Sequence, residues 1–289
     1  MHYRFLALVT ALVSAFASPG HTQDAAPRPG TLPAVSGLNG KFSLESGIES
    51  SFGKATGVGL ASGSITMPLG HAFGLQFDAD AATREGNADG GGTAHLFWRD
   101  PAMGLLGLIG SVEGDATGHV GSYGVEGEFF AGPVTLGTSM GYVDTAASVL
   151  GQTGGFYEAH VQVYPAPDLS LNAGLEAVLG HLSGSASVEY QPTLLQQHNV
   201  SFFVDTEAGD QSFSSVTAGI RFYFGADKTL IRRHREDDPE YNPTLMAVES
   251  AMARRAWEEA RDRANRPPEV PVFYPRPFLP LPFIPRPSP

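Results

Sequence analysis

The residues of this chain that could do chemistry are mainly carboxylates, and they occupy alternate positions of short apolar segments. Asp78 and Asp80, for example, alternate with Phe77 and Ala79. Residues 40–225 hold 19 Asp and Glu against 5 Lys and Arg, a net charge of −14. Carboxylates that line a passage favour cations over anions. The positions that we predict to face such a passage are Asp78, Asp80, His95, Arg99, Glu126, Glu128, Glu158, His160, Glu176 and Arg221.

One short motif could supply a nucleophile. His181-Leu182-Ser183 resembles the His-x-Ser element of outer-membrane phospholipases and lipid A deacylases. A catalytic serine needs a base within hydrogen-bond reach and an acid that orients the base. Glu176 is the nearest acid, and Gly184 stands where those families often have Asn. We therefore expect an extracellular turn here and no enzyme, with a lipid hydrolase as a remote alternative.

The sequence gives little support for a phosphate-binding loop, a metal site or a cofactor site. The run Gly90-Gly91-Gly92 is not followed by a helix, so we predict a loop tip and not a phosphate-binding loop. The histidines are scattered, and no His pair has metal-ligand spacing on a helix. The chain has no Cys. We expect no catalytic residue, no metal, no cofactor and no nucleic-acid partner.

The elements that must position these carboxylates read as β-strands. Segments of about ten residues alternate between apolar and polar positions throughout residues 40–225, and a turn follows each segment. About twelve such segments can be counted, within a range of about 8–14, and an even count suits an outer-membrane barrel. We predict an all-β fold, an antiparallel transmembrane β-barrel. The competing interpretation is a soluble β-sandwich, which would bury its apolar face.

The last segment, residues 214–225, is the clearest of these strands. Its apolar positions, Val216 to Phe224, share one parity, and Arg221 lies on the other. We expect Arg221 to face the lumen and to pair with Glu45, Glu126 or Glu207. The lumen itself has two interpretations: a narrow cation-preferring channel for small solutes, or a closed structural barrel filled by paired polar side chains.

The turns indicate which end of the barrel faces which side. Four short connections contain Pro, near residues 68–71, 99–102, 131–133 and 165–168, whereas 84–92, 114–119 and 145–155 are longer or rich in Gly. Short periplasmic turns and long external loops are typical of outer-membrane barrels. Residues 191–199 are an exception, a long connection on the short-turn side. The aromatic girdle expected at that side comprises Trp98, Phe129, Phe130 and Tyr164.

The N-terminus predicts export. Residues 1–17 combine a weakly basic start, an apolar run and the small-x-small sequence Ala15-Phe16-Ala17, as a signal peptide does. The apolar run is too short to span a membrane as a helix. Residues 18–39 are rich in Pro, Gly, Ala and Ser, and we expect a flexible lead-in.

The composition changes after the barrel. Residues 226–289 carry 11 of the 18 Lys and Arg and 10 Asp and Glu. Arg232, Arg233 and Arg235 either bind an anionic partner or form a self-paired, solvated segment. We predict that residues 226–266 form a polar linker and a helix that carries Trp257, a further partner-binding candidate. Residues 267–289 contain ten Pro and favour polyproline II, which suits contact with a periplasmic protein or the cell wall.

The end of the barrel segment also carries a resemblance. The sequence A-G-I-R-F-Y-F-G, followed by K-T-L-I-R-R-H-R-E-D-D-P, resembles a family of uncharacterised, porin-like Gram-negative outer-membrane barrel proteins. The resemblance implies location in the outer membrane, contact with its lipid, and a tail in the periplasm. It implies no established activity. Ordinary outer-membrane barrels end at their terminal aromatic residue, whereas 65 residues follow Phe224 here. The oligomeric state stays open.

Overall fold

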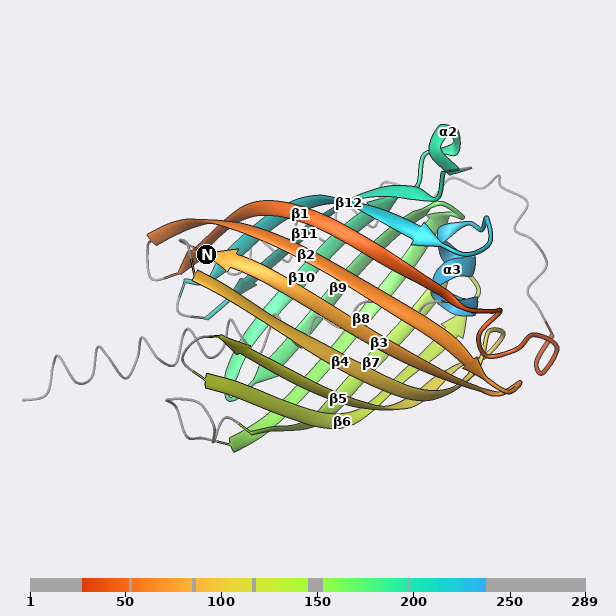
Figure 1. Cartoon of the computed structure of the whole chain (residues 1–289), viewed down its shortest axis with the longest axis horizontal. Helices are drawn as coiled ribbons and strands as arrows, with labels where there is room; N and C mark the ends of the chain where they lie inside the picture. The colour runs from red at the N-terminus through yellow and green to blue at the C-terminus, as the bar shows by residue number, and fades with distance from the viewer. Residues whose placement is uncertain are drawn as a thin grey trace, which may run out of the picture.

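The computed structural model describes residues 28–51, 54–84, 87–115, 118–144, 153–196, 198–210 and 212–237. Within them, twelve antiparallel strands form one closed barrel (Figure 1). Each strand pairs with its neighbours in sequence, and β1 pairs with β12. The strands are β1 (Asn39–Ser51), β2 (Lys54–Leu69), β3 (Phe73–Arg84), β4 (Asn87–Asp100), β5 (Gly104–Asp115), β6 (Gly118–Ala131), β7 (Val134–Asp144), β8 (Thr153–Ala166), β9 (Leu169–Val178), β10 (His181–Tyr190), β11 (Val200–Gly209) and β12 (Ser214–Phe224).

The alternation of the sequence sets which side chains lie inside. In β3, Phe73 and Phe77 are half exposed on the outer face, whereas Gln76 and Asp78 are buried. The same division recurs around the wall, so the apolar parity faces outward and the polar parity faces inward. A soluble sandwich would have the opposite arrangement. The prediction of a twelve-stranded transmembrane barrel is therefore confirmed, because closure pairs the backbone groups and the exterior suits lipid.

The seam between the first and last strands shows the same register. Phe42 lies opposite Phe222, and Leu44 lies opposite Ile220, with all four side chains on the outer face. Arg221 lies opposite Ser43 on the inner face. Because a one-residue slip would reverse every side chain, this pairing fixes the inward direction of Arg221. Among the described residues, no helix is long and apolar enough to cross a membrane.

Two predicted loops are wrong. β3 ends at Arg84 and β4 begins at Asn87, so Gly90-Gly91-Gly92 lies within β4 and not at a loop tip. Gly90 pairs with Ala81, and Gly91 pairs with Asp80. Residues 114–119 are likewise mostly strand. Glycine carries no side chain to mark a parity, so a hydrogen-bonded strand rich in Gly resembles a loop in sequence.

The expected turn at Ser183-Gly184 is also displaced. These residues belong to β10, and the connection from β9 is Leu179-Gly180, where both residues have positive φ, 53° and 87°. At the other end of the barrel, the long connection between β10 and β11 contains the short helix α2 (Thr193–Gln196). Figure 1 shows α2 projecting from the rim, away from the barrel axis.

A second helix, α3 (Leu230–Glu236), follows β12 and lies across the same end of the barrel (Figure 1). We call this end the α3 end. The sequence suggested a flexible lead-in over residues 18–39, but its described part contacts the α3 end. Ala34 and Val35 are buried, and Val35 packs against the inward side chains of Phe97 and Leu105. The other end holds an apolar cluster inside the wall: Ile109, Val120, Val143, Phe156, Val178 and Leu179.

Candidate functional site

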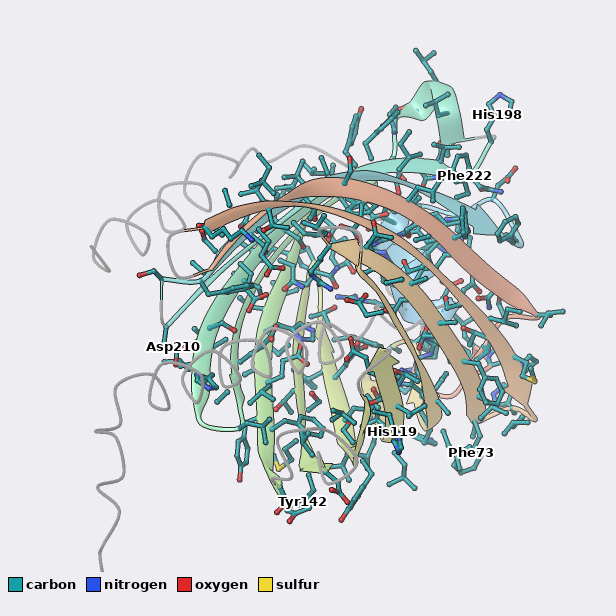
Figure 2. All side chains as sticks on the ribbon, turned by 60° about the vertical axis from the view of Figure 1, so that its left-hand side comes forward. Phe73, His119, Tyr142, His198, Asp210 and Phe222 are labelled. Carbon is teal, nitrogen blue, oxygen red and sulfur yellow. The ribbon has the colours of Figure 1, made fainter. Side chains whose placement is uncertain are left out.

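The barrel interior contains a cavity of about 170 Å³ with a strongly acidic wall. Figure 2 shows the division of side chains, with Phe73, Tyr142 and Phe222 directed away from the barrel. Four of the predicted carboxylates line the cavity, namely Glu126, Glu128, Glu158 and Glu176. Glu45, Glu189, Asp205 and Glu207 also line it; the sequence had offered Glu45 and Glu207 as lumen partners of Arg221, but none of the four was among the ten positions predicted to face the passage. His160 and Arg221 also line it, so the cavity gathers most of the predicted interior positions.

The remaining predicted positions lie in the interior outside the cavity wall. His95 is buried between two carboxylates: Nε2 lies 2.9 Å from Asp78 Oδ2, and Nδ1 lies 2.9 Å from Glu126 Oε2. Asp80 is half-buried on the same face of β3. Arg99 lies near the α3 end, where its Nε donates a 2.6 Å hydrogen bond to the Ala34 carbonyl. Its guanidinium stacks on the Phe97 ring at 5.0 Å.

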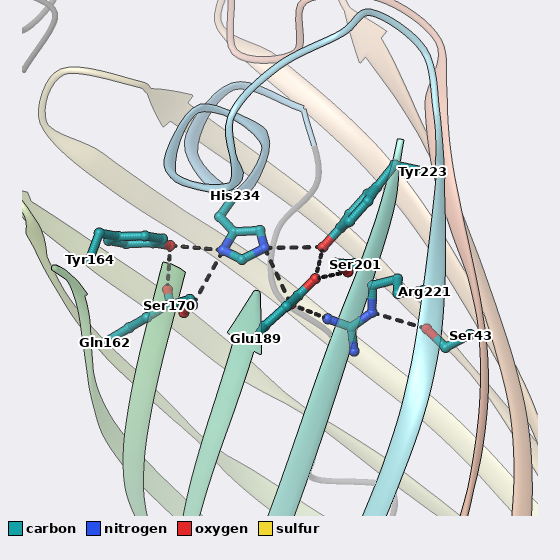
Figure 3. Close-up of polar contacts among 9 residues, drawn as sticks. All are labelled: Ser43, Gln162, Tyr164, Ser170, Glu189, Ser201, Arg221, Tyr223 and His234. Carbon is teal, nitrogen blue, oxygen red and sulfur yellow. Dashed lines mark hydrogen bonds and ion pairs between the residues drawn. The ribbon is translucent and has the colours of Figure 1, made fainter. Parts of the chain in front are cut away.

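Arg221 pairs with a carboxylate that the sequence did not indicate. Its Nη1 lies 2.5 Å from Glu189 Oε2, and its Nε donates to Ser43 Oγ at 3.0 Å (Figure 3). The guanidinium also lies 4.5 Å from the centre of the Phe203 ring. The predicted ion-pair partner, one of Glu45, Glu126 and Glu207, is wrong, although Arg221 also acts electrostatically on Glu45. Glu189 lies two strands away on β10, and the register of β10, β11 and β12 brings it within reach of Arg221 across β11.

Glu189 also lies where the barrel wall contacts α3. Ser201 and the Tyr223 hydroxyl both donate to its Oε1, at 2.5 and 2.6 Å. His234 projects from α3 toward this group, and its Nε2 lies 3.8 Å from Glu189 Oε2 (Figure 3). On its other side, His234 Nδ1 lies 2.8 Å from the Tyr164 hydroxyl. His234 therefore joins the helix to β8, β10 and β12 at once.

Three tail arginines were predicted to bind a partner. Two of them, Arg233 and Arg235, contact the barrel. Arg233 is buried, bonds to Asn199 Oδ1, and lies 4.6 Å from the Tyr223 ring centre. Arg235 donates to the carbonyls of Gly132 and Val134, at 2.8 and 2.9 Å. Arg232 is about half exposed and pairs with Glu236. Trp257 lies outside the described residues.

Two aromatic residues of the predicted girdle face inward, toward Arg235. The sequence placed Phe130 and Tyr164 in an outward aromatic girdle with Trp98 and Phe129. Trp98 and Phe129 do face outward, but Phe130 and Tyr164 are buried on the inner face. The Arg235 guanidinium lies 4.9 Å from the Phe130 ring centre and 5.7 Å from that of Tyr164. Adjacent residues of a strand point to opposite faces, so Phe129 and Phe130 could not both be outside.

The lead-in and the segment after β12 are bonded to each other at the α3 end. Lys228 Nζ lies 2.9 Å from Ser36 Oγ, 2.7 Å from Asp237 Oδ1 and 3.0 Å from Glu236 Oε2. The Ser36 amide donates to the Glu236 carbonyl at 3.0 Å. A buried lysine with two carboxylates and a hydroxyl is well compensated for its loss of hydration. Residues 34–36 and α3 therefore form one packed plug, which we call the mouth plug.

The ionised carboxylate of Glu236 stabilises the docked state of this plug. Burial by itself would raise the pKa of Glu236, but hydrogen bonds from Arg232 and Lys228 outweigh burial, so the pKa lies below its usual value of 4.5. The stabilisation from Glu236 is thus fully present above the usual pKa and is lost as the pH falls through the lowered pKa. Burial also lowers the pKa of Arg235 and raises the pKa of Asp168, which lies in the turn beneath α3.

The geometry around the His-x-Ser motif does not suit a lipid hydrolase. His181 and Ser183 are both buried on the inner face of β10, where acyl chains of the bilayer do not reach. His181 Nδ1 lies 3.0 Å from Asp210 Oδ2. Ser183, however, is two residues from His181 on the same strand, and such residues are separated by about 6.6 Å along the strand. In the part of the chain that the structure describes, no group of three His, Asp or Glu could hold a metal ion.

No protein-family model matches the chain, and no curated protein matches it in sequence. Solved structures with a similar shape include the NanC porin, with a TM-score of 0.49, 9% identity, and coverage of 63% of this chain and 98% of that one. The KdgM porin has a TM-score of 0.48, 10% identity, and coverage of 62% and 98%. Outer membrane phospholipase A from Escherichia coli has a TM-score of 0.44, 11% identity, and coverage of 70% and 99%.

Proposed function

We propose that this protein is an outer-membrane β-barrel channel with a narrow, cation-preferring passage for small solutes. The observation that carries the proposal is the cavity wall, in which carboxylates from many strands face one space with Arg221 and His160 as the basic side chains. Carboxylates that share a low-dielectric space attract cations and repel anions. The signal-like N-terminus and the apolar exterior support location in the outer membrane. In this proposal the α3 end faces the periplasm.

A second function is favoured by a separate observation. The mouth plug contacts inward side chains of the barrel at the α3 end, through His234 on Tyr164 and Arg235 on Phe130, and the remaining chain continues from it. A barrel closed in this way would serve as an anchor that holds residues 238–289 in the periplasm, against a protein or the cell wall. Lipid of the outer membrane would then be the partner of the barrel, and the Pro-rich tail would bind the second partner.

A planar-bilayer experiment tests the channel. Purified full-length protein is expected to give conductance steps and, in a KCl gradient, a reversal potential that favours K⁺. Replacing Glu126 and Glu128 together by Gln should reduce this preference, because both carboxylates line the cavity. Asp144→Asn is the matched control, since Asp144 is exposed at the far end of β7 and should leave selectivity unchanged.

The result decides between the two functions. Absence of conductance steps, both in the full chain and in a chain that ends at residue 225, would reject the channel and leave the anchoring barrel. Steps without cation preference would retain the channel and reject its ion selectivity. An unchanged reversal potential in the Glu126 and Glu128 variant would show that other carboxylates set the selectivity.

A further inference from the structure

We propose that His95 is a positioning residue of the passage, and that it holds the carboxylate of Glu126 against the barrel wall. This role rests on the proposed channel, and it sets how much negative charge one side of the acidic cavity presents to a passing cation. His95 lies outside the cavity wall, whereas Glu126 belongs to it. His95 therefore acts on the passage through Glu126.

The contact between His95 and Glu126 involves one ring nitrogen and both carboxylate oxygens. His95 Nδ1 lies 3.0 Å from Glu126 Oε1 and 2.9 Å from Oε2. The imidazole is 1% exposed and the Glu126 side chain is 15% exposed, so water competes little for this hydrogen bond. A single proton at the contact makes the bond, and it can reside on the nitrogen or on the carboxyl group. The tether therefore does not depend on which of the two groups is charged.

The other side of the His95 ring is fixed from the neighbouring strands. Nε2 lies 2.9 Å from Asp78 Oδ2, and Asp78 accepts hydrogen bonds of 2.9 and 3.1 Å from Gln76 Nε2. Gln76 Oε1 accepts in turn from Thr66 Oγ1 at 2.8 Å. Thr66, Gln76 and Asp78 are all buried. This chain of polar contacts crosses β2, β3 and β4, and it leaves the imidazole little freedom to turn.

Glu126 reaches His95 across β5, at a position where that strand carries no side chain. Glu126 lies opposite Gly107 on β5, and His95 lies opposite Ile109 on the same strand. The Glu126 side chain therefore crosses β5 diagonally, over Gly107. A Cβ at Gly107 would lie 2.6 Å from Glu126 Oε1, and 3.0 Å from Glu126 Cγ and from Phe97 Cβ. Glycine at this position thus provides the space in which the carboxylate lies against the wall.

The tether determines where the charge of Glu126 acts. While His95 holds it, the carboxylate lies over β5 and is bonded to a basic ring. Without the tether, the side chain is free to turn toward the cavity, which Glu126 lines together with Glu128 and Glu158. A carboxylate that is nearer to a passing cation, and not bonded to a base, attracts that cation more strongly. Release of Glu126 should therefore raise the cation preference of the passage.

Two variants release Glu126 by different means. His95→Gln removes the ring nitrogen that contacts the carboxylate and keeps a polar side chain toward Asp78. Gly107→Ala leaves His95 in place and displaces the carboxylate, because the atom nearest to the added Cβ is the flexible end of Glu126. The matched controls are His119→Gln, since His119 is exposed on β6, and Gly110→Ala on β5, whose added Cβ would lie 3.8 Å from its nearest atom.

Bilayer recordings of the full-length protein in a KCl gradient measure the effect on selectivity. His95→Gln and Gly107→Ala should each raise the ratio of K⁺ to Cl⁻ permeability about twofold, the effect of one unit charge about 10 Å from the ion in a water-like dielectric. Both effects should vanish in a Glu126→Gln background, because the side chain that moves is then uncharged. An effect of His95→Gln that persists there would come from Asp78 or another group, and it would overturn the role of His95. An unchanged ratio in both variants would overturn it as well.

A second measurement does not depend on conductance. In protein labelled with ¹⁵N-histidine, the imidazole signals of His95 are those that disappear in His95→Gln. Glu126→Gln and Gly107→Ala should shift the Nδ1 signal, because a neutral or displaced acceptor weakens the hydrogen bond, whereas His119→Gln should leave it unchanged. No shift in either variant would overturn the tether even in a conducting barrel. Shifts in a protein that never conducts would reject the proposed channel and retain the tether. Heat-dependent gel mobility verifies folding, and either variant decides alone where the other does not fold.

Discussion

At the scale of single residues, Arg221 and Glu189 form an ion pair whose side chains are largely buried in the interior. The carboxylate of Glu189 accepts from Arg221, Ser201 and Tyr223, and it also faces His234. Breaking one partner of a buried pair leaves the other charge uncompensated, at a cost of about 3–5 kcal/mol. Removing both partners together therefore costs less than removing either one.

We therefore predict that Arg221→Met lowers the free energy of unfolding by about 3–5 kcal/mol, measured by urea titration with gel mobility as the folded-state signal. Arg232→Met is the matched control. Its side chain is 48% exposed in its ion pair with Glu236, so the expected loss is at most about 1 kcal/mol. Equal losses in the two variants would contradict the importance of the buried pair. Adding Glu189→Met to Arg221→Met should recover part of the loss.

At the scale of elements, the pairing of β6, β7 and β8 depends on glycine at a close contact. Gly141 lies opposite Gly124 on β6 and opposite Phe156 on β8. A Cβ at Gly141 would meet the Tyr123 carbonyl oxygen, and it would lie 2.6 Å from the Phe156 ring. Phe156 is buried in the apolar cluster with Val143, so the ring has little room to move.

Gly141→Ala is accordingly expected to destabilise the barrel by about 1–3 kcal/mol, through overpacking of the apolar cluster. Gly121→Ala on β6 is the control, because the nearest atom to its added Cβ is the Ser111 carbonyl oxygen at 3.8 Å. The control should change stability by less than about 1 kcal/mol. Urea titration of both variants checks the difference, and equal midpoints would mean that β7 can shift to accept the methyl group.

At the scale of the whole molecule, closure is the property that stabilises the fold in lipid. β1 and β12 pair over residues 40–50 and 214–224, so the described wall has no open edge. We predict that the full chain migrates faster in detergent gels before boiling than after, because the closed ladder resists unfolding. A chain lacking residues 214–289 cannot close and should migrate identically before and after boiling. Identical mobility of the full chain would contradict a closed transmembrane barrel.

The sequence alone determined the inside and the outside of this molecule. Side-chain direction in a strand alternates with period two, so Val216 and Phe224 on one parity and Arg221 on the other already assigned lipid and lumen. The twelve strands followed from the same local pattern. Local alternation failed where the sequence lacked side chains, at Gly90–Gly92, and where two aromatics adjoin, at Phe129 and Phe130.

Only the tertiary structure decided which interior groups meet. Arg221 pairs with Glu189 and not with Glu45, Glu126 or Glu207, because the register of β10, β11 and β12 places Glu189 beside it across β11. The Arg-rich segment resembled a solvated linker, yet Arg233, His234 and Arg235 dock on the barrel. Their partners come from strands far away in sequence, and a run of charges does not record which surface will compensate it. The periodicity of a strand is local, whereas the contacts that close this mouth are not.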